Sequence, residues 1–170
     1  MDLKQYIRDI PDFPKKGIIF KDITTLLKEP APFKYVIDSI VSKYKDKNIN
    51  KVVSVEARGY IFGGVLAYNL NCGFVPVRKP GKLPSETLAM EYTLEYGTNT
   101  IEIHKDALKI DERVLIFDDL LATGGTVQAT CQLVEKLGAK IIGCAFLINL
   151  TFLKGLEKLK GYDVFSLIEY

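Results

Sequence analysis

The sequence predicts an α/β protein with a central, mostly parallel β-sheet flanked by helices. Short, near-continuous apolar runs such as Val114–Phe117 alternate along the chain with segments in which apolar residues recur every three or four positions. Strands that are apolar on both faces are typical of a parallel sheet covered by helices on both sides. The 170 residues, of which 48% are hydrophobic and 26% charged, are enough for a core of this kind.

Residues that interrupt regular structure are frequent near the amino terminus: Pro11, Pro14, Gly17 and Pro30. We expect a short helix at about residues 2–9 and then a turn. An amphipathic helix follows, because apolar side chains recur at steps of three and four: Phe33, Val36, Ile37, Ile40, Val41 and Tyr44. The segments 51–56, 58–70 and 73–78 have the patterns of a strand, a helix and a strand, which predicts a strand–helix–strand unit.

The second half of the chain continues this alternation after a loop, 79–88, that contains two prolines and a glycine. Period-two alternation predicts a hairpin over residues 89–104 that turns around Tyr96–Asn99. The next elements are expected to be a strand, a helix, a strand, a short helix and a strand: 113–119, the stretch from Val127 to Leu137, 140–150, 151–159 and 162–170. Gly138 is a natural helix stop, and Gly155–Gly161 is expected to be an exposed helix end.

A glycine-containing turn follows the most strand-like run of the chain, at the end of a parallel sheet where ligands bind. We call it the glycine loop; its residues are Ala122, Thr123, Gly124, Gly125 and Thr126. Helix-opening amides carry partial positive charge, and glycine lets a ligand approach the backbone, so the loop predicts a phosphate site. Asp118 and Asp119 precede it and suit ribose hydroxyls, so a sugar phosphate would satisfy both features. The alternative is an ordinary helix start capped by Thr123.

A second loop, in the stretch Ser54–Gly64, repeats the arrangement of strand end, acid and helix start. We call it the arginine loop; it comprises Glu56, Ala57 and Arg58. The planar guanidinium of Arg58 suits bidentate contact with a phosphate. The alternative is that Arg58 pairs with Glu56 as a structural ion pair.

Several motifs together carry a family resemblance. "VLIFDDLLATGGT" is similar to the ribose 5-phosphate motif of the purine phosphoribosyltransferases. "DFPKKGIIFKDIT", "EARGYIFGG", "VPVRKPGKLPSET" and "LEYG" resemble segments of the adenine phosphoribosyltransferases, and "EARG" and "VRKPGKLP" are typical of bacterial members. The resemblance implies the type I phosphoribosyltransferase fold, as one domain over 1–170 with an amino-terminal base-binding hood at about 1–30 and a mobile lid hairpin at about 79–101.

The resemblance also implies a purine salvage reaction. The 5-phosphoribosyl group of 5-phosphoribosyl 1-pyrophosphate would pass to adenine and give AMP and pyrophosphate. Mg²⁺ would be the cofactor, held mainly through the substrate rather than by direct protein ligands. The expected partners are these two small molecules and a second copy of the chain in a homodimer.

By the same resemblance, the glycine loop would bind the 5′-phosphate, and Asp118 and Asp119 would face the ribose. The arginine loop and three further basic residues would bind pyrophosphate: Arg78, Lys79 and Lys82. Phe20 and Leu150 would stack on the two faces of adenine, while Ile19 and Lys21 would contact it through their backbone groups.

Two further residues, Glu95 and Tyr96, fall in the segment that the family uses as a lid. Glu95 is the candidate that handles the purine proton, since a carboxylate suits transfer of a proton from nitrogen. Arg58 would stabilise the charge that develops on the departing pyrophosphate.

Composition narrows the remaining possibilities. The net charge of +2 gives no reason to expect nucleic acid binding, and no apolar run is long enough to span a bilayer. The amino terminus lacks the apolar region of a signal peptide. The three cysteines show no metal-binding spacing, so we expect reduced, mostly buried thiols and a cytoplasmic protein.

Two other functions are compatible with the same fold. One is a sensor that binds phosphoribosyl pyrophosphate without turnover; the complete lid, with Lys82, Glu95 and Tyr96, and the lack of an appended helix-turn-helix favour an enzyme. The other is transfer to hypoxanthine, guanine or xanthine. The amino-terminal "GIIFKD" favours adenine, because 6-oxopurine enzymes usually recognise the base from near their carboxyl end.

Overall fold

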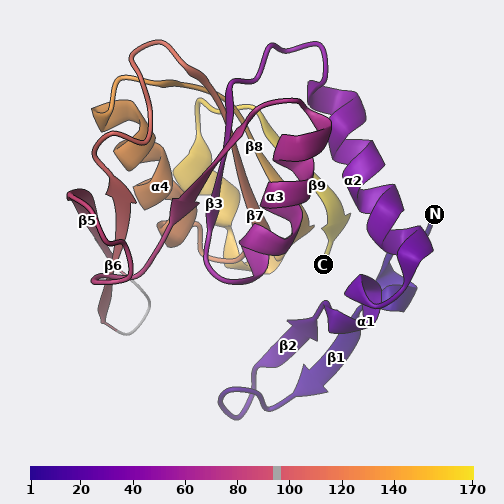
Figure 1. Ribbon diagram of the computed structural model, residues 1–170. Coiled ribbons are helices and arrows are strands. Elements are labelled where there is room, and N and C mark those ends of the chain that lie inside the picture. Colours follow the sequence, from indigo (N-terminus) through magenta and orange to yellow (C-terminus); the bar gives the residue numbers. More distant parts are fainter. Residues whose placement is uncertain (94–96) are drawn as a thin grey trace. The chain divides into compact units, whose positions relative to one another are not determined.

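The computed structural model describes residues 1–93 and 97–170, which form two compact units, Met1–Ser39 and Ile40–Tyr170. The larger unit contains a five-stranded parallel sheet in the order β4-β3-β7-β8-β9 (Figure 1). Its strands are β3 (Lys51–Val55), β4 (Gly73–Val77), β7 (Arg113–Leu121), β8 (Lys140–Asn149) and β9 (Val164–Glu169). The predicted α/β class is confirmed.

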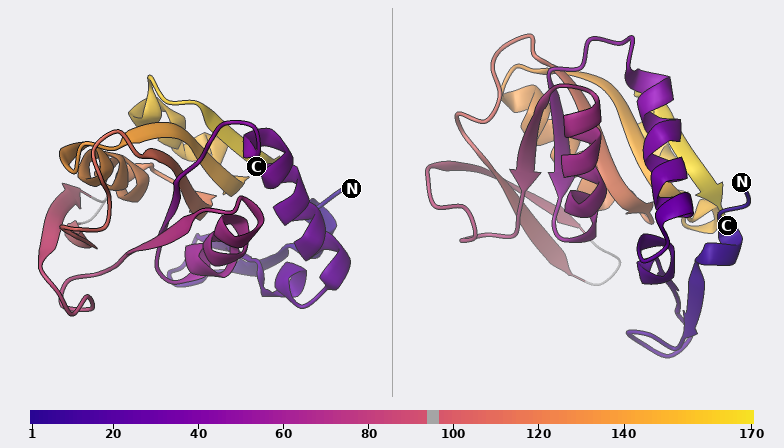
Figure 2. Two further views of the ribbon diagram at one scale, coloured as in Figure 1. Left: turned by 45° about the horizontal axis from the view of Figure 1, so that its top comes forward. Right: turned by 45° about the vertical axis from the view of Figure 1, so that its right-hand side comes forward.

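Helices α3 (Arg58–Asn69) and α4 (Gly125–Lys136) cover opposite faces of this sheet (Figure 2). Side chains alternate between the faces of a strand. Accordingly, Ser54 of β3 lies against α3, while its neighbours Val53 and Val55 belong to the apolar core on the α4 side. The near-continuous apolar pattern of the strands reflects this double cover.

The elements of the larger unit follow the predicted order, with differences at the end of β7 and at the helix predicted for 151–159. β7 continues through Leu121, because its pairing with β8 extends as far as Leu121 opposite Asn149. Asp118 and Asp119 lie within the strand, as predicted, and the strand continues for two residues beyond Asp119. The short helix predicted at 151–159 is two 3₁₀-helices, η2 (Thr151–Leu153) and η3 (Gly155–Leu159), separated by Lys154 in a left-handed conformation (φ 54°).

The predicted amphipathic helix is α2 (Pro30–Tyr44), and its last residues belong to the larger unit. Tyr44 is fully buried and occupies the space over Gly143 of β8, where a Cβ would lie 2.7 Å from the tyrosine hydroxyl. Two of the cysteines are core residues as expected, since Cys131 and Cys144 are buried with their Sγ atoms 3.8 Å apart.

The smaller unit differs from the sequence prediction. Instead of a helix over residues 2–9 it contains the 3₁₀-helix η1 (Lys4–Tyr6) and then β1 (Arg8–Pro11). β1 pairs antiparallel with β2 (Ile19–Asp22), which leads into the short helix α1 (Thr24–Leu27). Cross-strand pairing, with an ion pair between Arg8 and Asp22, replaces the local helical preference. The single domain and the hood at about 1–30 remain predictions.

The predicted hairpin is present as β5 (Thr87–Thr93) and β6 (Thr98–His104). Thr98 already pairs with Thr93, so Thr98 and Asn99 belong to β6 rather than to the turn. Tyr96 and Glu95 lie outside the described residues. The inner face of the hairpin packs on the core next to α4 through alternate side chains: Leu88, Met90, Tyr92, Ile101 and Ile103.

Within the part of the chain that the structure describes, no helix combines the length and the apolar character needed to cross a bilayer.

Candidate active site

One cavity of about 290 Å³ brings the two predicted loops together at the carboxyl ends of β3 and β7. It is lined by residues of the arginine loop, the glycine loop, both aspartates, one predicted lysine and the hairpin: Val55, Glu56, Ala57, Arg58, Lys79, Tyr92, Ile101, Asp118, Asp119, Leu120, Ala122 and Thr126. Thirteen residues were predicted to bind the 5′-phosphate, the ribose or the pyrophosphate, and eight of them share this cavity: Glu56, Ala57, Arg58, Lys79, Asp118, Asp119, Ala122 and Thr126.

The glycine loop has the form of a helix-opening anion site. Gly124 adopts a left-handed conformation (φ 78°) and is the N-cap of α4, so the alternative in which Thr123 caps the helix is wrong. The first helical hydrogen bond is donated by Gln128 to the Gly124 carbonyl oxygen, 2.9 Å away. The amides before Gln128 have no partner within the helix. A smaller cavity of about 140 Å³, lined by the whole loop, lies beside them.

Gly155 supports the glycine loop from outside and was missed by the sequence analysis. It is buried, and a Cβ on Gly155 would lie 2.3 Å from the Ala122 carbonyl oxygen. A Cβ on Gly124 would in turn lie 2.6 Å from the Gly155 carbonyl oxygen. The segment expected to be an exposed helix end therefore begins with a buried residue that contacts the loop. Nothing in its local sequence other than the glycine itself indicates this long-range contact.

The arginine loop is held by ion pairs with residues outside it. The Glu56–Ala57 peptide bond is cis. Arg58 pairs with Asp119 (Nε–Oδ2 2.8 Å), so the alternative in which it pairs with Glu56 is wrong. Glu56 instead pairs with Arg78 at 3.0 Å and accepts a hydrogen bond of 2.6 Å from the Lys79 backbone N–H.

These contacts set the ionisation of Glu56. Burial by itself raises the pKa of this carboxyl, but the hydrogen bonds from the Lys79 N–H and from Arg78 outweigh burial, and the pKa is lower than usual. Glu56 is therefore ionised at neutral pH and fixes the two basic residues that follow β4. The Arg78 guanidinium also donates to the Lys82 carbonyl oxygen at 3.1 Å, which ties the basic segment together.

The carboxyl groups of Asp118 and Asp119 both have raised pKa values. Burial and the neighbouring charge of Asp119 raise the pKa of Asp118 well above its usual range. Burial also raises the pKa of Asp119, and Arg58 limits that rise. Asp119 is 5% exposed, and its Oδ2 lies 2.8 Å from Arg58 Nε without a further partner among the described residues. A buried acceptor in this position suits a ligand with hydroxyl donors, such as a ribose.

The residues predicted to contact adenine belong to different units. Residues 19–21 lie in β2 of the smaller unit. There the Phe20 ring packs edge-on against the Phe13 ring, with 5.1 Å between the ring centroids. Leu150 lies in the larger unit, directly after β8, and its N–H donates to the Leu121 carbonyl oxygen at 2.9 Å. Their convergence on one base therefore remains a prediction. The roles of Glu95 and Tyr96 also remain predictions, because both lie outside the described residues.

Tyr92 lines the larger cavity and was not singled out from the sequence. It lies on β5, and its hydroxyl accepts a hydrogen bond from Thr126 Oγ1 at 3.2 Å. A tyrosine in an alternating strand is an ordinary packing residue by sequence, so only the tertiary structure identifies this contact.

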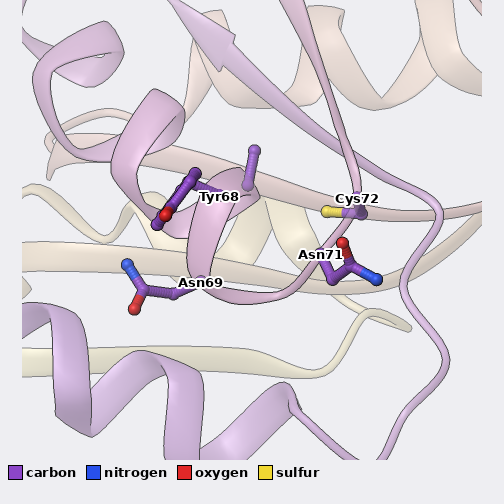
Figure 3. A pocket seen from close by; sticks show the side chains of 5 residues that line it. Tyr68, Asn69, Asn71 and Cys72 are labelled. Atoms are coloured by element: carbon purple, nitrogen blue, oxygen red, sulfur yellow. The ribbon is translucent and has the colours of Figure 1, made fainter.

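A separate pocket lies at the other end of the strands, around the end of α3 (Figure 3). Figure 3 shows that its labelled side chains, Tyr68, Asn69, Asn71 and Cys72, do not converge on a common point. Ligands of open α/β sheets bind at the carboxyl ends of the strands. The cavity between the two loops is therefore the candidate active site.

Known proteins are similar to this chain in sequence and in fold. The family model of the phosphoribosyl transferase domain matches residues 22–168. The chain is 57% identical to adenine phosphoribosyltransferase from Halothermothrix orenii over 99% of both chains. It is 55% identical to the crystal structure of the Thermoanaerobacter pseudethanolicus adenine phosphoribosyltransferase, with a TM-score of 0.96 over 99% of this chain and 98% of that one.

A more distant structure contains ligands. Adenine phosphoribosyltransferase from Saccharomyces cerevisiae was solved in complex with an imino-altritol bisphosphate and adenine; it is 40% identical, with a TM-score of 0.91 over 97% of this chain and 96% of that one. The fold, the two loops and these similarities agree, and the chain belongs to the adenine phosphoribosyltransferases, within the phosphoribosyl transferase domain family.

Proposed function

We propose that this chain transfers the 5-phosphoribosyl group of 5-phosphoribosyl 1-pyrophosphate to adenine, giving AMP and pyrophosphate in purine salvage. The observation that carries the proposal is the single cavity whose lining combines residues of the helix-opening glycine loop, basic residues and carboxylates. A ligand with a phosphate at each end and a hydroxyl-bearing ring in the middle matches this set of groups.

The two ends of the ligand are assigned to the two loops. The amides of the glycine loop and the Thr126 hydroxyl bind the 5′-phosphate. Arg58 and Lys79, both in the cavity lining, bind the pyrophosphate group, with Arg78 and Lys82 on the segment next to them. Asp118 and Asp119 accept hydrogen bonds from the ribose hydroxyls.

The reaction exchanges one bond for another at the anomeric carbon. A purine nitrogen forms a bond to this carbon as the bond to the pyrophosphate oxygen breaks, and the pyrophosphate takes the bonding electrons. Glu95 accepts the proton that the purine nitrogen loses. Arg58 stabilises the negative charge on the leaving group.

Mg²⁺ fits this cavity as a companion of the substrate. Phosphate oxygens are its preferred ligands, and the carboxylates of Asp118, Asp119 and Glu56 line the same cavity. When bound, the ion neutralises part of the pyrophosphate charge. Among the described residues, no group of three or more acidic, histidine or cysteine side chains is arranged to hold a metal ion by itself.

The choice of base is tested by competition. The purified chain is mixed with Mg²⁺, phosphoribosyl pyrophosphate and equal amounts of adenine, hypoxanthine, guanine and xanthine, and the nucleotide product is identified. We expect AMP alone. Another nucleotide would overturn the assignment of adenine, and tight binding without any product would favour the sensor.

The role of Glu95 is tested by Glu95→Gln, which removes the ionisable group and keeps the size. We expect turnover to fall by about 10²-fold or more while AMP affinity changes by less than about threefold, because general base catalysis contributes to the transition state. Glu91→Gln is the matched control, since Glu91 is exposed on β5 of the same hairpin. Equal losses of turnover and affinity in Glu95→Gln would contradict a catalytic role.

We also propose a homodimer in the cytoplasm. Exposed apolar side chains lie on α3 and on the edge strand β4: Ile61, Tyr68 and Phe74. Apolar surface of this kind favours association. Light scattering on Ile61→Lys would test the surface, with Ile110→Lys as the control because Ile110 is 78% exposed elsewhere in the larger unit. A dimer that survives Ile61→Lys unchanged would exclude this surface.

A further inference from the structure

Tyr92 joins the hairpin to the glycine loop. Its ring packs on the core together with Leu88 and Met90, which share its face of β5. Its hydroxyl lies 3.2 Å from Thr126 Oγ1, and both residues line the candidate active site. The contact is therefore made by an anchored side chain, and it reaches a residue of the proposed phosphate site directly.

The hydrogen-bonding capacity of two hydroxyls limits what this contact can do. A threonine hydroxyl has one proton to donate and can accept through its lone pairs. In the structure, Thr126 donates this proton to Tyr92. A phosphate oxygen without a proton can only accept, so a bound phosphate requires the same Thr126 proton. The tyrosine hydroxyl, which carries a proton of its own, can then become the donor.

We infer that Tyr92 is a positioning residue for the 5′-phosphate. When phosphate binds, the contact keeps its partners and reverses its direction: the Tyr92 hydroxyl donates to Thr126 Oγ1, and Thr126 donates to a phosphate oxygen. Hydroxyls that donate and accept in a chain strengthen one another, so Tyr92 both orients the Thr126 proton and makes it a better donor. This inference rests on the proposed function and adds a hairpin residue to its phosphate site.

Tyr92→Phe removes only the hydroxyl. We expect it to weaken the binding of ribose 5-phosphate, measured by calorimetry, by about threefold to tenfold, the range of one hydrogen bond. The KM for phosphoribosyl pyrophosphate should rise by a similar factor, and the KM for adenine should stay unchanged. The matched control is Tyr162→Phe, because the Tyr162 hydroxyl donates to Glu135 of α4 at 2.7 Å, away from the cavity. This control should change ribose 5-phosphate binding by less than about twofold.

Two variants at Thr126 show whether Tyr92 acts through this residue. In a Thr126→Val background, Tyr92→Phe should have no further effect, because the chain of hydroxyls is already broken. In a Thr126→Ser background, which keeps the hydroxyl, the full effect of Tyr92→Phe should return. Thermal unfolding of each variant confirms that it is folded.

Three results would overturn the inference. The first is a double variant, Tyr92→Phe with Thr126→Val, whose loss of ribose 5-phosphate affinity equals the product of the two single losses. The others are equal losses of affinity in Tyr92→Phe and Tyr162→Phe, or no binding of ribose 5-phosphate by the unaltered chain. The proposed function fails separately, if the unaltered chain forms no AMP, because ribose 5-phosphate binding is measured without adenine.

Discussion

The glycine loop and the arginine loop occupy equivalent places in the fold, but the first depends on backbone conformation and the second on charged side chains. Each follows a strand of the same parallel sheet and opens a helix on one of its faces. The glycine loop relies on backbone conformation, with Gly124 in a left-handed conformation against the backbone of Gly155. The arginine loop relies on charged side chains, with Arg58 paired to Asp119 and Glu56 paired to Arg78.

This difference determines which changes each loop tolerates. A site made of amides keeps its charge distribution whatever the side chains are, but it has no room for an added atom. A site made of ion pairs has room for change but depends on the presence and geometry of each charge. We therefore expect volume changes to damage the glycine loop and charge geometry to matter most in the arginine loop.

The largest effect is expected from Gly124→Ala. The added Cβ would lie 2.6 Å from a carbonyl oxygen, and the positive φ of this position disfavours alanine. We expect ribose 5-phosphate binding to weaken by about 10²-fold and the free energy of unfolding to fall by about 1–3 kcal/mol. Calorimetry and denaturant unfolding measure the two quantities.

Gly64→Ala is the control for this change. Gly64 lies in α3 with nothing within 4 Å of an added Cβ, and alanine favours a helix over glycine. This variant should be as stable as the unaltered chain or more so, with normal ligand binding. If Gly124→Ala behaved in the same way, the phosphate site would not be made by the backbone of the glycine loop.

A smaller and more selective effect is expected from Arg58→Lys, which keeps the charge and removes the planar fork. The KM for phosphoribosyl pyrophosphate should rise by about tenfold, the value of one lost charge-assisted hydrogen bond. Ribose 5-phosphate lacks the pyrophosphate group, so its affinity should change by less than about threefold. Equal losses for both ligands would show that the two loops do not serve separate phosphate groups.

The same contrast explains how much the sequence could predict. The helix-opening form of the glycine loop was predictable because it depends on residues that are adjacent in the sequence and on a strand-to-helix transition with a clear apolar pattern. The sheet was predictable for the same reason, since each strand and helix has its own periodicity. Local pattern also gave Arg58 a role as a fixed cation but offered the wrong ion-pair partner, Glu56 instead of Asp119.

Three of the unpredicted features depend on long-range contacts. Gly155 contacts the glycine loop, and Tyr92 contacts Thr126, although neither is near its partner in the sequence. The helix expected at residues 2–9 is in part the strand β1 because of its pairing with β2. In each of these cases tertiary contacts outweigh a local preference.

The smallest expected effect is on stability, and it comes from the carboxyl group of Asp118, which precedes the glycine loop. The pKa of Asp118 is raised by burial and by Asp119, so the folded chain holds this proton to higher pH than the unfolded chain does. Between the unfolded pKa of about 4 and the raised folded pKa, the folded state binds more protons, and its stability falls as pH increases. Asp118→Asn removes this loss and should stabilise the fold at neutral pH by on the order of 1 kcal/mol.

The gain in stability of Asp118→Asn should grow as pH rises through that window and be absent below about pH 4, where Asp118 is protonated in both states.

Asp163→Asn is a control for which the expected change in stability has the opposite sign. The Lys47 hydrogen bond, with Lys43 nearby, lowers the pKa of Asp163, so this carboxylate stabilises the fold above the unfolded pKa and loses that effect as pH falls. Thermal unfolding across pH distinguishes the two. If Asp118→Asn destabilised the chain at neutral pH while ribose binding fell, Asp118 would be a structural acceptor. If the variant were instead more stable but lost ribose binding, the fold would retain an unfavourable charge because the ligand needs it.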